Sequence, residues 1–195
     1  AIQKDRQQAN QWVVLDRMRG GSNILDTSST SAENTNGTGS YFSGMDYMDG
    51  IDLNFFSSDT SNNIVYNWKR APNFFDVVAY SGNSITSTAI NHNLGVAPEI
   101  VIVKNLTSHA WEIYHPRSAD SGIQYSNDWS GAENFGVWAS THPTTSVVTV
   151  SAGNGVNRIP ANNGQVGYMM YSFASKAGFS KIGTHLANGN VDGPF

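Results

Sequence analysis

The sequence has 195 residues, which fits one large domain or two of about 100 residues each. Charged residues make up 13% and hydrophobic residues 39%, with nine Phe, eight Tyr and five Trp, a balance that argues against disorder. The net charge of −4 offers no basic face for phosphates, so nucleic acid is not expected as a partner. There is no cysteine and no apolar run of membrane-spanning length, which excludes disulfides, thiolate metal sites and membrane insertion by a helix.

The apolar segments are short and rich in β-branched and aromatic residues, and turn signals such as Asn-Gly and Asp-Gly separate them. The predicted strands are VVL at 13–15, IDLNFF at 51–56, FFDVVAY at 74–80, EIVIVK at 99–104, WEIY at 111–114, SVVTV at 146–150 and VGYMMYSFA at 166–174. The pattern predicts an all-β fold of antiparallel β-sandwich or jelly-roll-like units in tandem, with few or no helices. The only helix candidate, at 2–11, competes with a strand interpretation.

Part of the sequence is repeated about 100 residues further along the chain. At an offset of 105, YNWKRAPNFFDVVAYSGNS (66–84) matches YSFASKAGFSKIGTHLANG (171–189). This alignment places Tyr66 on Tyr171, Trp68 on Phe173 and Phe74 on Phe179. AIQK at 1–4 matches VIVK at 101–104, which favours a strand at the N-terminus, and Trp12 matches Trp111. We therefore expect equivalent, buried positions for the paired aromatic residues in two similar folds.

The phase of the repeat predicts three segments. Residues 1–73 form an incomplete first unit, residues 74–182 a complete second unit, and residues 183–195 the start of a third unit or a C-terminal assembly strand. The first unit lacks a counterpart of YSGNSITSTAINHNLGVAPE (80–99). Because the chain begins with Ala1, it is expected to be a processed product or a window on a longer polypeptide.

Three stretches together resemble a known family: INHNLGVAPEIVIVKN (90–105), WEIYHP (111–116) and GYMMYSFASKAGFSKIGTHLANGN (167–190). They are similar to a repeat domain of tailed-phage virion proteins, frequent in phages of cyanobacteria and marine bacteria. The resemblance implies a tail-fibre, baseplate or other exterior virion protein, with copies of itself and other virion proteins as partners. It brings no catalytic residues.

Candidate chemistry is sparse. The histidines His92, His109, His115 and His142 lack metal-ligand spacing, and Asp46, Asp49 and Asp52 fit a hairpin tip more simply than a calcium loop. The carboxylates that a glycosidase would need are available in Glu99, Glu112, Glu133, Asp120 and Asp128, but Glu133 repeats Glu33 and so is expected to be structural. We expect no catalytic residues, no metal and no cofactor.

The loop YSNDWSGAENFGVWASTHP (125–143) is the best binding candidate, because aromatic side chains alternate there with small polar ones. A host surface glycan could contact Tyr125, Asp128, Trp129, Trp138 and His142. The alternative is that Trp138 and Phe135 cap a core, since burying an aromatic side chain stabilises by about 2–3 kcal/mol.

The incomplete first unit is expected to leave a sheet edge without its partner strand, and such edges promote association. The C-terminal GTHLANGNVDGPF could add a strand to that edge on a neighbouring copy. The predicted assembly residues are His185, Leu186, Asn188, Val191 and Phe195. The alternative is that upstream residues of a longer fibre supply the missing strands.

Overall fold

The computed structural model describes residues 1–5, 12–21, 23–34, 63–116, 122–126, 135–152, 155–159 and 166–183. The described chain is nearly all β, as the sequence predicts, and its strands are antiparallel throughout. The predicted segments at 51–56 and 184–195 lie outside the described residues, so the assembly positions His185, Leu186, Asn188, Val191 and Phe195 are not described.

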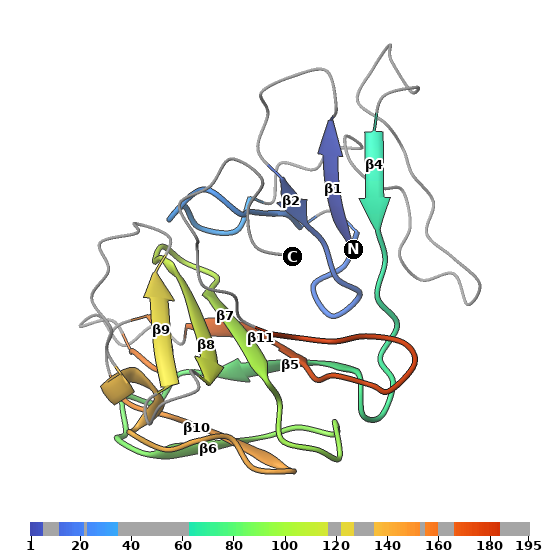
Figure 1. The fold of residues 1–195 in the computed structure, drawn as a ribbon. Helices are drawn as coiled ribbons and strands as arrows, with labels where there is room; N and C mark the ends of the chain where they lie inside the picture. Colours follow the sequence, from blue (N-terminus) through green and yellow to red (C-terminus); the bar gives the residue numbers. More distant parts are fainter. Residues whose placement is uncertain are drawn as a thin grey trace, which may run out of the picture.

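Three sheets stack as layers, visible one above another in Figure 1. The first sheet contains β1 (Ile2–Asp5), β2 (Val13–Val14), β3 (Leu25–Asp26) and β4 (Asn63–Tyr66) in the order β3-β2-β1-β4. The central sheet contains β5 (Phe75–Ser81), β7 (Ile100–Asn105), β8 (Trp111–Pro116), β9 (Gly122–Ser126) and β11 (Gly167–Phe173) in the order β5-β11-β7-β8-β9. The third pairs β6 (Thr88–Asn91) with β10 (Val147–Val150), and η1 (Phe135–Trp138) is a 3-10 turn beside it.

Both faces of the central sheet are buried. Successive residues of β11 point to opposite cores: Tyr168 and Met170 pack toward β6, β10 and η1, and Met169 and Tyr171 pack toward the first sheet. This is why GYMMYSF reads as a continuous apolar run rather than an alternating one.

The first sheet repeats the pairing of the central sheet at the offsets found in the sequence. Ile2 pairs with Val14 and Tyr66, just as Ile102 pairs with Ile113 and Tyr171. The outer strand follows the same rule, since Val14 pairs with Leu25 as Ile113 pairs with Tyr125. β4-β1-β2-β3 therefore corresponds to β11-β7-β8-β9, and β1 is a strand from Ile2 to Asp5 rather than the start of a helix.

The turns after β4 and β11 are also equivalent. Backbone hydrogen bonds close residues 71–75 and 176–180 in the same way, and the third residue of each turn has a positive φ, 61° at Asn73 and 75° at Gly178. Equivalent residues then touch each other, because Phe74 packs edge-on against Phe179 at 4.8 Å and Trp68 against Phe173 at 6.1 Å. Contacts between like positions indicate an approximate two-fold relation between the two sheets.

Gly82, at the end of β5, is held where no side chain fits. A Cβ there would lie 2.5 Å from the Arg158 carbonyl oxygen and 2.8 Å from Tyr168 Cε2. We expect Gly82→Ala to lower the free energy of unfolding by about 1–3 kcal/mol, the usual cost of overpacking. Gly183→Ala is the matched control, because a Cβ at Gly183 meets nothing within 4 Å. Urea unfolding of the two variants measures the difference; equal midpoints would contradict the close packing at Gly82.

Candidate functional site

An apolar hollow opens on the first sheet beside β4. Its volume is about 330 Å³, and Ile2, Trp12, Thr27, Tyr66 and Trp68 line it. We call these five residues the aromatic pocket. The Tyr66 ring lies 6.0 Å from the Trp12 ring at an interplanar angle of 23° and 6.2 Å from the Trp68 ring at 27°, so Tyr66 is stacked between the two tryptophans.

Two residues of the aromatic pocket are exposed, whereas their counterparts in the central sheet are not. Trp12 is 37% exposed and Tyr66 45%, but Trp111 and Tyr171 are buried. The expectation that Trp12 and Trp111 are both buried is therefore wrong. Tyr171 has β5 beside it and Trp111 bonds to the first sheet, and among the described residues nothing equivalent to β5 lies beside β4.

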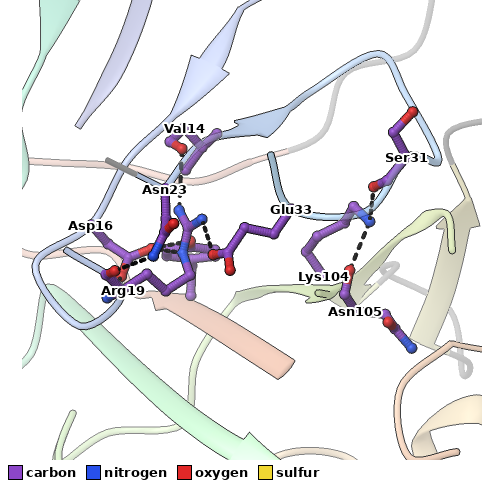
Figure 2. Close-up of polar contacts among 9 residues, drawn as sticks. Val14, Asp16, Arg19, Asn23, Ser31, Glu33, Lys104 and Asn105 are labelled. Carbon is purple, nitrogen blue, oxygen red and sulfur yellow. Dashed lines mark hydrogen bonds and ion pairs between the residues drawn. The ribbon is translucent and has the colours of Figure 1, made fainter. Parts of the chain in front are cut away.

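A buried polar cluster joins the first sheet to the central sheet (Figure 2). Arg19 donates to Asp16 Oδ2 at 2.6 Å, to Glu33 Oε1 at 2.8 Å and to the Val14 carbonyl at 3.1 Å. From the central sheet, Tyr171 donates its hydroxyl proton to the same Asp16 Oδ2 at 2.8 Å. The buried Arg19 guanidinium forms charge-assisted hydrogen bonds with the Asp16 and Glu33 carboxylates. Because Tyr171 also bonds to Asp16, the cluster holds the first sheet to the central sheet.

Lys104 forms a second bridge at this junction. Its ammonium donates to the carbonyl oxygens of Ser31 at 3.0 Å and Asn105 at 2.8 Å, and its side chain is fully buried (Figure 2). Burial, and secondly the nearby Arg19 charge, lower the pKa of Lys104 from 10.5 to about 8. The two carbonyl dipoles stabilise the ammonium charge of Lys104. The bond to Ser31 holds the segment that contains residues 31–34 against β7.

Stability should rise with pH between about 8 and 10 because of Lys104. In that window the unfolded chain holds the Lys104 proton and the folded chain has released it, so raising the pH favours the folded state. Lys104→Met should abolish this slope, and Lys4→Met, at the corresponding position of β1, should keep it. Urea midpoints at half-unit pH steps measure the slope; a slope that survives in Lys104→Met would contradict the assignment.

The structure separates the residues predicted to bind a glycan. Trp138 is fully buried in the core beneath Tyr114, so it has no face to offer a ligand, and its position is the core role given as the alternative. His142 lies exposed on the other side of Tyr114, and its Nδ1 is 2.6 Å from the Tyr114 hydroxyl. Tyr125 is placed only by its backbone in β9, while Asp128 and Trp129 lie outside the described residues.

Two other candidate residues, His92 and Glu99, form hydrogen bonds with backbone groups. His92 Nδ1 accepts from Leu94 N at 3.2 Å and its Nε2 donates to the Thr144 carbonyl, which closes the turn before Gly95. The Glu99 carboxylate accepts from the Ser175 amide and hydroxyl at 3.0 and 2.8 Å. Within the described ranges no cluster of His, Asp or Glu has a metal-binding arrangement, and Asp46, Asp49 and Asp52 fall outside those ranges.

Sequence reasoning used Trp12, Tyr66 and Trp68 as repeat markers and did not identify them as a site. The sequence offers one difference between the copies here, since the first carries WVVLDR where the second has WEIYHP. Exposure depends on the strand beside each copy, which the repeat alone does not reveal.

The fold and this surface define an all-β protein of stacked antiparallel sheets with an apolar hollow on its outer sheet. Residues 2–195 match the family DUF7483, a domain of unknown function, and the chain belongs to that family. Neither a curated protein nor a solved structure matches the sequence. Within the described ranges there is no helix with the length and hydropathy of a membrane span.

Proposed function

We propose that the chain is a non-enzymatic structural protein of the exterior of a phage virion, acting in assembly and surface presentation. The observation that supports this proposal best is that the residues carrying the family resemblance, where the structure describes them, take part in packing and hydrogen bonds within the fold. The sequence motifs describe a scaffold, and a scaffold repeated in tandem suits a fibre, baseplate or other exterior component.

The described residues of the resembling motifs make contacts in each part of the fold. His92 and Gly95 shape the turn that leads to β7, and Lys104 ties β7 to residues 31 and 105. Trp111 donates its indole proton to the Asp26 carbonyl at 2.9 Å, and Tyr114 packs on Trp138 in the core. The polar atoms named here form hydrogen bonds to other groups of the protein, which is a structural role.

Immunogold labelling tests the proposal. Antibodies raised against the purified chain should decorate the outside of intact particles purified from the source of this protein, and mass spectrometry should detect the chain in those particles. Absence of the chain from purified particles would refute the virion role. Particles lacking the gene product should fail to assemble or to attach to host cells.

Carbohydrate binding is the second candidate function, and the aromatic pocket is the observation that favours it. Exposed aromatic rings such as those of Trp12 and Tyr66 can stack on sugar rings, and Thr27 is a polar residue in the lining of the pocket. A glycan array with the wild-type chain and Tyr66→Ala tests it. Binding that Tyr66→Ala abolishes would favour this function; no signal on any glycan would remove it.

A further inference from the structure

The outer edge of β4 corresponds to an edge that is occupied in the central sheet. There β11 pairs with β7 on one side and with β5 on the other, from Gly167↔Ser81 to Phe173↔Phe75. Its counterpart β4 pairs with β1 in the same register, but in the described part of the chain no strand lies on its other side. The N–H and C=O groups on that side of an edge strand are available for pairing.

The aromatic pocket lies where the side chains of such a strand would pack. In the central sheet, Phe75 and Val77 of β5 lie beside Phe173 and Tyr171, and Phe75, Val77 and Tyr171 belong to one core cluster. The corresponding Tyr66 is 45% exposed and lines the hollow together with the half-buried Trp68. Among the described residues, the unpaired edge of β4 and the exposed Tyr66 thus point to the same strand position.

Two segments of the β5 kind follow two equivalent turns. Residues 75–82 follow the turn after β4 and pair with β11. Residues 180–187, SKIGTHLA, follow the equivalent turn after β11 and are the counterpart in the 105-residue repeat. Because β4 is the counterpart of β11, and no described strand lies on its other side, β4 is the matching acceptor for residues 180–187.

We propose that β4 and the aromatic pocket form a docking site for residues 180–187 of a second copy of the chain. The strand adds antiparallel to β4 in the register that β5 takes on β11, so that Tyr66 faces Ile182 and Ile64 faces Thr184. Ile182 then enters the pocket as Val77 enters the equivalent place in the central sheet. Backbone pairing supplies affinity, and the pocket selects the side chain.

A second copy is favoured over the same chain as the donor. Tyr66 and Ile182 are both described and do not pair with each other in this structure. Instead the Ile182 amide donates to Ser175 Oγ at 2.8 Å, which keeps the start of the segment at its own turn. Pairing with β4 of another molecule is head-to-tail, so repeated contacts give a closed ring or an open filament.

Cysteine cross-linking tests the register, since the chain has no native cysteine. Ile64→Cys and Thr184→Cys are made in separate chains, mixed and mildly oxidised. We expect a disulfide-linked heterodimer to form at least about tenfold faster than with Ile64→Cys and His185→Cys, because facing residues lie side by side whereas the next residue points to the opposite face. Ile64 is 37% exposed, so the substitution leaves the core intact; near-ultraviolet circular dichroism verifies the fold.

Light scattering supplies an independent measurement. The wild-type chain should associate in a concentration-dependent way, and Tyr66→Ala should weaken association at least about tenfold, equivalent to 1.4 kcal/mol. Equal cross-linking with both partner variants, a monomer at all concentrations, or a cross-link within a single chain carrying Ile64→Cys and Thr184→Cys would overturn the proposal. A glycan that competes for the pocket without any chain-to-chain cross-link would also overturn it.

This inference rests on the proposed structural role but fails separately from it. A chain that stays monomeric yet is found on the particle exterior keeps the virion role and loses the docking site. A chain that cross-links in the expected register but is absent from particles keeps the docking site and loses the virion role.

Discussion

Arg19→Met should lower the free energy of unfolding by about 3–5 kcal/mol, the largest loss we expect from a polar substitution in this protein. The side chains of Arg19 and Asp16 are 4% and 7% exposed, and Glu33 is 17% exposed. Methionine matches the aliphatic stem of arginine but leaves both carboxylates without their cation. Two largely buried negative charges that lose their shared cation cost far more than the loss of an exposed ion pair.

Lys69→Met is the control for loss of a positive charge. Because Lys69 is exposed, its replacement should change the free energy of unfolding little. Urea unfolding followed by tryptophan fluorescence measures both variants. Arg19→Met with the same midpoint as Lys69→Met would show that the polar cluster does not fasten the sheets.

The sequence was sufficient to predict the all-β fold because its strands carry their own signals. β5, β7, β8, β10 and β11 fall on β-branched or aromatic runs bounded by turns. The short strands β3, β4, β6 and β9 were missed. NIVY and TAIN each have only two or three apolar residues, and pairing along their full length with β1 and β10 holds them in place.

The candidate site was harder to predict than the fold. A periodic pattern shows that Trp12 and Trp111 occupy the same place in two copies, but exposure depends on what lies across from each residue. Trp111 packs in the cluster between the two sheets, and its indole proton is donated to the Asp26 carbonyl. For Trp138 the sequence left two roles open, glycan contact or core packing, and its position against Tyr114 is buried.

Trp111→Ala and Trp12→Ala should therefore have very different effects despite their equivalent positions. Trp111 is 6% exposed, and its removal would leave a cavity in the cluster between the two sheets and strip the Asp26 carbonyl of its donor. We expect a loss of about 3–5 kcal/mol, typical of a buried tryptophan. Trp12 is 37% exposed and contacts Tyr66 through one stacked face, so its removal should cost about 1 kcal/mol or less.

Each substitution is the control for the other, because the sequence change is the same and the two residues hold equivalent places in the repeat, Trp12 directly before β2 and Trp111 at the start of β8. Unfolding should be measured at low protein concentration, where association through the aromatic pocket contributes nothing to the apparent stability. Equal losses at the two positions would mean that Trp12 is covered in solution as Trp111 is, and the pocket would not be open. A large loss at Trp111 alone would show that the two copies of one strand have diverged, one to hold the sheets together and the other to face outward.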